Sequence, residues 1–144
     1  MAHSYLHAKS AAKKFGGVPE DYLAISDFFD GTKAHLADAR HRMLLHNSYG
    51  VFLCERIFGH VIVNSDGKDV PVRLIAERHV TEDFGWIPSV EQCLAGMPLE
   101  KWMFQGAAQL SRDPQLHVLK PSEEGRQVAT PEEYRAYEHA HEEA

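Results

Sequence analysis

The sequence predicts a mainly α-helical fold: a compact domain of about five to six helices with one short β-hairpin near residues 60–72. Apolar residues recur at the three- and four-residue spacing of amphipathic helices along most of the chain. Residues typical of helix starts and stops frame these stretches. Only residues 60–72 change to the β-branched composition and turn residues that indicate a hairpin.

Two helices are predicted at the start of the chain. The first covers about residues 4–14, is rich in alanine, and ends at Gly16-Gly17, as expected of a helix C-cap. The second begins at Pro19, which suits a first helical position, and carries apolar residues at helical spacing as far as Phe29. Asp30-Gly31 ends it.

The longest helical pattern begins at Thr32, a predicted N-cap, and ends at Gly59. Gly50 lies inside this pattern, and an interior glycine costs a helix about 1 kcal/mol relative to alanine. The sequence therefore leaves two alternatives for residues 32–58, one long helix or two shorter ones.

The hairpin and the helix after it follow from the next change of pattern. Val61-Ile62-Val63 is β-branched, Asn64-Ser65-Asp66-Gly67 has turn chemistry, and Pro71 weakens the second arm. An apolar stripe at helical spacing then runs from Val72 to Val80, and Gly85 ends the predicted helix.

Two further helices are predicted towards the C-terminal end. Ser89 with Gln92, and Thr130 with Glu133, each form a capping-box pattern at a helix start. The apolar periodicity fades between these two helices. We therefore expect a helical core domain over residues 1–103. Residues 104–144 should form an arm and an acidic C-terminal helix, packed on this domain or extending from it.

Composition and charge argue against several classes of function. The chain has 144 residues, 21 of them acidic and 15 basic, so we expect no nucleic-acid binding, which needs a basic face. No apolar run approaches the roughly 20 residues of a membrane span. Cys54 and Cys93 lack the CxxC spacing of redox or zinc motifs. We expect a cytoplasmic protein without membrane contacts.

Ten histidines are the least ordinary feature of the sequence. His41 lies on the predicted buried face of the long helical pattern, three residues after Asp38. His79 lies on the apolar stripe of the later helix, three and four residues before Glu82 and Asp83. When two helices pack about 8 to 10 Å apart, such pairs can converge on one ion. These five residues are therefore predicted metal ligands, and their N and O donors suit Zn, Fe, Mn or Ni.

Three more residues are conditional candidates. His7 lies on the first helix. Glu55 shares a side of the long pattern with His41, but 14 residues of straight helix span about 21 Å, so both reach one ion only if the chain turns back near Gly50. His46 lies on a neighbouring face, for which a solvated polar stripe is the favoured interpretation.

Several short blocks of the sequence form a recognisable set. They are His7-Ala8-Lys9-Ser10, Gly16-Gly17, Ala37-Asp38-Ala39-Arg40-His41-Arg42, Gly50 with Glu55, Phe58-Gly59, Asn64-Ser65-Asp66-Gly67, and Glu77-Arg78-His79-Val80-Thr81-Glu82-Asp83-Phe84-Gly85-Trp86-Ile87-Pro88. Over about residues 1–103 they resemble a small uncharacterised family of tailed phages and proteobacteria. The resemblance implies a phage or mobile-element origin and no particular activity.

Two classes of function follow from these observations. A metal ion with an open coordination position can activate water, which would make the protein a metal-dependent hydrolase. Alternatively, the same polar residues form a buried hydrogen-bond network that fixes the packing of two helices. The protein is then a non-catalytic accessory protein that binds and inhibits a host protein. In that case residues 98–129 are the expected segment for host binding or self-association.

Overall fold

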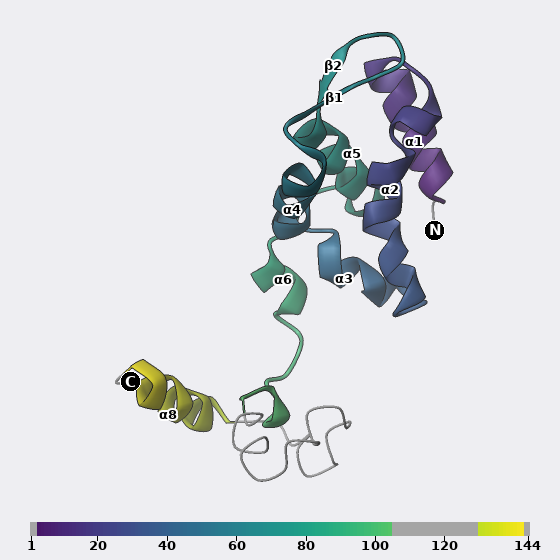
Figure 1. Ribbon diagram of the computed structural model, residues 1–144. Helices are drawn as coiled ribbons and strands as arrows, with labels where there is room; N and C mark the ends of the chain where they lie inside the picture. The colour runs from purple at the N-terminus through teal and green to yellow at the C-terminus, as the bar shows by residue number, and fades with distance from the viewer. Residues whose placement is uncertain (1–2, 105–129, 143–144) are drawn as a thin grey trace, which may run out of the picture. The chain divides into compact units, whose positions relative to one another are not determined.

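The computed structural model describes residues 3–104 and 130–142 of a chain that divides into two compact units, residues 1–94 and 95–144. The first unit contains the helices α1 (Ser4–Phe15), α2 (Leu23–Asp30), α3 (Arg42–Leu45), α4 (Ser48–Phe58), α5 (Val72–Phe84) and α6 (Val90–Leu94), with the strands β1 (Val61–Val63) and β2 (Asp69–Pro71) (Figure 1). The predicted mainly α-helical class with one short antiparallel hairpin is confirmed.

Helix α5 is the centre of the packing in the first unit, where it contacts α1, α2 and α4 (Figure 1). Its apolar stripe is buried as the sequence predicts, with Val72, Ile75 and Val80 at most 3% exposed. On α2, Ile25 and Phe29 are buried against the same core. Burying a side chain of this size contributes about 1.5–3 kcal/mol, so these contacts fix α5 relative to its neighbours.

The hairpin turn is tied to the connection between α1 and α2. The backbone N–H of Gly17 donates to Asp66 at 2.8 Å, and the backbone N–H and hydroxyl of Ser65 both donate to Asp21, at 3.0 and 2.8 Å. Gly17 has a φ of +74°, and a Cβ there would lie 2.2 Å from Asp21. A glycine is therefore required where the chain leaves α1.

The long helical pattern over residues 32–58 is divided in the structure. It comprises the 3₁₀ turns Gly31–Ala34 and Ala39–His41, then α3 and α4. The chain leaves the helical conformation at His46, which has φ −77° and ψ 60°. The side chain of Asn47 then caps α4 by accepting the backbone N–H of Gly50 at 2.9 Å. The pattern therefore holds separate helices, and it is interrupted between Ala34 and Ala39 and again at His46 and Asn47.

Gly50 allows α3 and α4 to cross at close range. A Cβ at this buried position would lie 1.6 Å from the carbonyl oxygen of Leu45. The missing side chain lets the start of α4 approach the end of α3 closely. This close crossing is what turns the chain back after α3.

Both predicted capping boxes are present. Ser89 and Gln92 exchange hydrogen bonds at the start of α6, at 2.9 and 3.1 Å. In the second unit, Thr130 and Glu133 do the same at the start of α8 (Pro131–Glu142). Most of the predicted interaction segment, residues 105–129 of 98–129, lies outside the described residues. No helix in the described ranges has the length and apolar character needed to cross a membrane.

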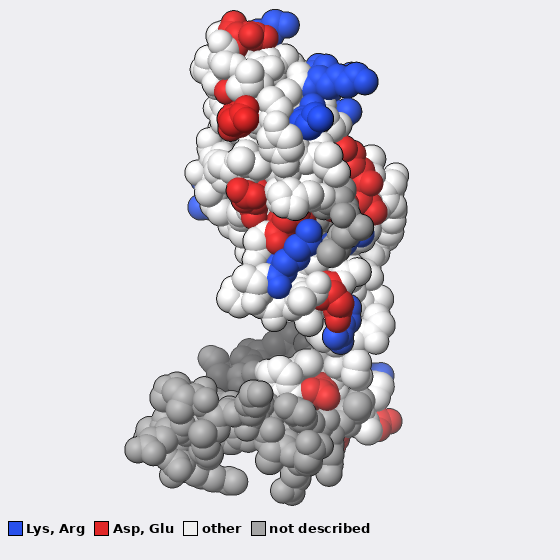
Figure 2. All heavy atoms as spheres, turned by 90° about the vertical axis from the view of Figure 1, so that its right-hand side faces the viewer, with Lys and Arg blue, Asp and Glu red and all other residues white. Residues whose placement is uncertain are grey.

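The described surface shows no single dominant charge on the face that carries α1. Figure 2 shows Lys and Arg side chains interspersed with Asp and Glu side chains over this face. Neither sign of charge forms a continuous patch across it.

Candidate metal centre

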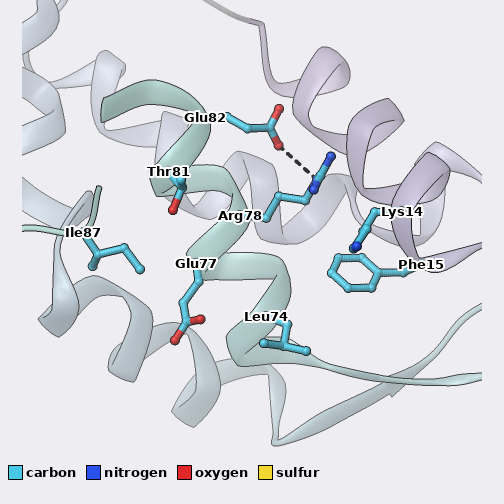
Figure 3. A pocket seen from close by; sticks show the side chains of 8 residues that line it. All are labelled: Lys14, Phe15, Leu74, Glu77, Arg78, Thr81, Glu82 and Ile87. Atoms are coloured by element: carbon cyan, nitrogen blue, oxygen red, sulfur yellow. Dashed lines mark ion pairs between the residues drawn. The ribbon is translucent and has the colours of Figure 1, made fainter. Parts of the chain in front are cut away.

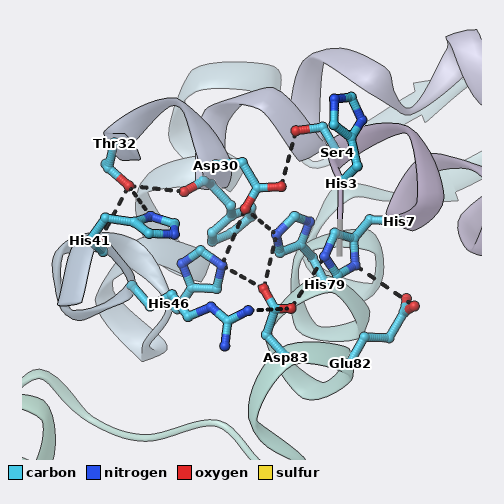
Figure 4. Close-up of polar contacts among 12 residues, drawn as sticks. His3, Ser4, His7, Asp30, Thr32, His41, His46, His79, Glu82 and Asp83 are labelled. Atoms are coloured by element: carbon cyan, nitrogen blue, oxygen red, sulfur yellow. Dashed lines mark hydrogen bonds and ion pairs between the residues drawn. The ribbon is translucent and has the colours of Figure 1, made fainter. Parts of the chain in front are cut away.

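Four side chains from three helices converge inside the first unit. They are His7 from α1, Asp30 from the last position of α2, and His79 and Asp83 from α5 (Figure 4). One potential ligand atom from each lies within 4.8 Å of the other three. All four side chains are at most 6% exposed. We refer to these four residues as the His/Asp cluster.

His46 faces the same carboxylates. Its Nε2 lies 2.9 Å from Oδ2 of Asp83 and 3.7 Å from Oδ1 of Asp30. Nε2 of His79 lies 3.4 Å from Oδ1 of Asp30 and 3.7 Å from Oδ2 of Asp83. Four donors placed 2.0–2.1 Å from one ion in a tetrahedron are about 3.3 Å apart. The separations of these two histidine nitrogens from the carboxylate oxygens, 2.9 to 3.7 Å, bracket this value.

His7 approaches from the other side of His79. Its Nε2 lies 3.3 Å from Oδ1 of Asp83, and its ring packs on the ring of His79 with centroids 3.9 Å apart. Nδ1 of His7 lies 3.8 Å from Glu82, whose side chain is 31% exposed. Glu82 therefore stands between the cluster and the surface of the protein.

Several histidine nitrogens in this group lack hydrogen bonds. Both ring nitrogens of His7, both of His79, and Nδ1 of His46 are buried without a hydrogen-bond partner in the described part of the chain. An unsatisfied buried polar group costs about 1–3 kcal/mol. A cation bound beside the two carboxylates would give these histidine nitrogens a partner.

The two carboxylates are held in place by other polar groups. The hydroxyl of Ser4 donates to Oδ2 of Asp30 at 3.0 Å, and the guanidinium of Arg42 donates to Oδ1 of Asp83 at 3.2 Å. Groups that orient a ligand in this way are typical of the outer shell of metal sites. The oxygens that face the histidines therefore have fixed positions.

The environment favours ionised carboxylates. Burial alone would raise the pKa of Asp83, but the hydrogen bond to His46, the nearby imidazole of His7 and the charge of Arg42 hold it well below its usual range. Burial also opposes ionisation of Asp30, and the nearby imidazole of His79 outweighs this effect and lowers the pKa of Asp30. Both carboxylates are therefore in the form that binds metal.

The pKa values of the two histidines in the cluster, His79 and His7, are shifted in opposite directions. Burial lowers the pKa of His79, which favours the neutral, metal-binding form of the ring. Burial acts in the same direction on His7, but the nearby carboxylate of Asp83 outweighs it, so the pKa of His7 is raised. A cation near Asp83 would therefore compete with a proton on His7.

The structure brings some of the sequence-predicted residues together. His79 and Asp83 lie in the cluster, together with His7, a conditional candidate. Glu82 lies at its edge. His46 was expected on a solvated stripe, and this is wrong, because its side chain is completely buried against Asp83.

Asp38 and His41 do not join the cluster. Asp38 caps the 3₁₀ turn Ala39–His41 and pairs with Arg40 at the surface, which lowers the pKa of Asp38 to about 2. His41 is buried, but its Nδ1 is 2.8 Å from the hydroxyl of Thr32. The shared helix face expected for Asp38 and His41 is absent, because the chain is not helical between Ala34 and Ala39.

Glu55 also lies elsewhere. Its Oε1 is 3.1 Å from Nδ1 of His60, an exposed histidine beyond the end of α4. The chain does turn back before α4, as a shared site with His41 would require, but α4 directs Glu55 to another region of the unit.

Asp30 is the cluster residue that sequence reasoning missed. Its position at Asp30-Gly31 suggested only the end of a helix. On α2, however, Asp30 lies four residues after Ser26, and both side chains are buried beside Phe29. A carboxylate next to an apolar stripe was the available signal, because such a group needs a partner if it is buried.

Comparison with known proteins adds one assignment. Neither the curated proteins nor the solved structures include a match to this chain. A family model described as a domain of unknown function, DUF6915, matches residues 2–103, a range that includes the whole His/Asp cluster and His46. The chain therefore belongs to the DUF6915 family.

Proposed function

We propose that this protein binds a divalent transition metal, Zn, Fe, Mn or Ni, through the His/Asp cluster. The observation that carries the proposal is the burial of two ionised carboxylates beside unsatisfied histidine nitrogens, with donors from all four residues within 4.8 Å of one another. Two buried carboxylates repel each other, and a divalent cation removes this cost. Mixed imidazole and carboxylate donors suit these four metals.

His46 acts with the cluster in this proposal. Its Nε2 contacts both carboxylates, so it either completes the coordination as a fifth donor or orients Asp83 by a hydrogen bond. In both roles, replacing His46 weakens metal binding without removing the four main ligands.

Hydrolysis is the reaction that such a centre supports. If three of the cluster residues held a divalent ion and a water took its fourth position, the ion would lower the pKa of that water and so supply hydroxide near neutral pH. Glu82 is the carboxylate at the exposed edge, 3.8 Å from His7, and we propose that it accepts the proton of this water. The protein is then a metal-dependent hydrolase.

A titration of metal-free protein tests the binding proposal. We expect Zn²⁺ or Mn²⁺ to bind at one equivalent per chain, measured by calorimetry, and His79→Ala and Asp30→Asn to abolish binding. His60→Ala is the matched control, since the side chain of His60 is 89% exposed and lies outside the cluster. Unchanged binding in His79→Ala and Asp30→Asn would overturn the assignment of these ligands.

A second candidate function keeps the same residues without a metal. Hydrogen bonds from Ser4 to Asp30 and from Arg42 to Asp83 connect α1 with α2 and α3 with α5, which favours a polar network that fixes helix packing. The protein is then a non-catalytic phage or mobile-element accessory protein that inhibits a host protein. Its contact segment is residues 98–129, and a truncation before residue 98 abolishes capture of that partner.

A further inference from the structure

A pocket of about 410 Å³ lies beside α5 (Figure 3). Its walls come from the end of α1, from α5 and from Ile87. Figure 3 shows the amine of Lys14 next to the ring of Phe15, whereas the guanidinium of Arg78 points towards Glu82. The pocket thus combines an apolar wall with the basic side chain of Lys14.

The apolar part of the pocket is formed by three side chains. Phe15, Leu74 and Ile87 line it together with the hydroxyl-bearing Thr81. Leu74 is 45% exposed, so this apolar surface is open to solvent. Covering such a surface contributes about 25 cal/mol for each Å² of apolar area removed from water.

The charges around the pocket leave one basic side chain uncompensated. Glu77 is paired with Arg73 at 2.6 Å, and Glu82 lies 3.5 Å from Arg78. Within the described ranges, Lys14 has no acidic side chain within 4.0 Å. Lys14 is therefore available to pair with an anion.

Arg78 also presents a fixed geometry. Its Nε and one terminal nitrogen both donate to the hydroxyl of Ser10, at 3.1 and 2.9 Å. This anchors the guanidinium to α1 beside Lys14. Because Arg78 is already engaged by Ser10 and Glu82, Lys14 is the basic side chain of the pocket that can pair with an incoming anion.

We propose that this pocket binds a small organic anion with an apolar body. Its carboxylate pairs with Lys14, and its apolar body covers Phe15, Leu74 and Ile87. The site is additional to the proposed metal centre and does not depend on it. Glu82 belongs to both regions, since its Oε1 faces Arg78 and its Oε2 faces His7.

Octanoate is a suitable probe, because it joins one carboxylate to an apolar chain. We would titrate it into the full-length protein, without metal and with added Zn²⁺, and follow the backbone amides by NMR. We expect the shifts to centre on Lys14, Arg78 and Leu74. Lys14→Glu should weaken binding about tenfold, the loss expected when one charge-assisted hydrogen bond is removed. Lys13→Glu should leave it unchanged, because Lys13 is on the same turn of α1 but does not line the pocket.

Two comparisons separate a specific site from general adsorption. Octylammonium has the same apolar chain with the opposite charge and should bind at least tenfold more weakly than octanoate. Leu74→Asp, at a partly exposed position where folding should tolerate the change, should also abolish octanoate binding. Equal binding of octylammonium, or equal weakening by Lys13→Glu and Lys14→Glu, would overturn the proposal. These results do not depend on whether the His/Asp cluster binds metal.

Discussion

Nε2 of His46 lies 2.9 Å from Oδ2 of Asp83, although 37 residues separate them in the chain. The contact exists because the chain leaves the helical conformation at His46 and restarts as α4 at Asn47. A continuous helix through residues 42–58 would carry His46 along the rod instead of holding it at the turn. The break between α3 and α4 therefore positions a buried histidine beside the cluster.

Replacing the residue that caps α4 should destabilise the protein and weaken metal binding. The buried side chain of Asn47 accepts the N–H of Gly50 and donates to the carbonyl of Met43 at 3.1 Å. We expect Asn47→Ala to cost about 1–3 kcal/mol in urea unfolding. Ser89→Ala, which removes an exposed cap, should cost less. Equal losses in the two variants would show that the Asn47 turn has no special role.

A side chain at Gly50 should be far more disruptive than one at Gly31. Gly50→Ala places a Cβ 1.6 Å from the Leu45 carbonyl oxygen, so α3 and α4 must separate. We expect a loss above about 3 kcal/mol, as for severe overpacking of a core. Gly31 has a helical φ of −60° and open space around it, so Gly31→Ala should be neutral or slightly stabilising. Thermal unfolding of the pair measures the difference, and similar melting temperatures would contradict the close crossing.

Metal should stabilise the folded state. A ligand present at 100 times its dissociation constant contributes about 2.7 kcal/mol, which for a unit of this size corresponds to roughly 10 °C in melting temperature. We expect this increase with Zn²⁺ or Mn²⁺, its reversal by EDTA, and its absence in His79→Ala. The control His60→Ala should retain it. A melting temperature that does not respond to either reagent would favour the polar-network alternative.

Cys54 should remain a protonated, unreactive thiol in the native protein. Burial raises its pKa to about 12, whereas an unfolded cysteine has a pKa near 9.0. A raised folded-state pKa gives stability that is present below pH 9 and is lost as the pH rises towards 12. Between pH 8 and pH 10, the wild type should lose about 1 kcal/mol more than Cys54→Ala in urea unfolding.

The two cysteines allow an internal control for this prediction. Cys93 is half-buried and should react with a thiol reagent in the native protein at pH 8. Cys54 is fully buried and should react only after unfolding. Equal native reactivity of both thiols would contradict the burial of Cys54.

The predictable part of the fold is the part determined by local pattern. The stripe on α5 is set by its own periodicity, so His79 and Asp83 could be assigned to a buried face from sequence alone. The capping boxes at Ser89 and Thr130 involve residues three positions apart and were equally readable.

The rest of the site depends on contacts between distant segments. Asp38 and His41 satisfied the same helical spacing rule as His79 and Asp83, but Asp38 instead caps a short turn and bonds to Arg40. Local spacing could not reveal that the chain breaks after Ala34 and again at His46, since the helical spacing of apolar residues continues across both breaks. Asp30 enters the cluster only because α2 packs against α5.

The most direct test of the metal centre is elemental analysis by mass spectrometry. Untagged protein would be purified without chelator or added metal, so that no tag histidines contribute. We predict about one equivalent of Zn, Fe, Mn or Ni per chain in the wild type and almost none in His79→Ala. A wild-type protein without any of these metals, and unable to take them up on incubation, would contradict the proposed centre.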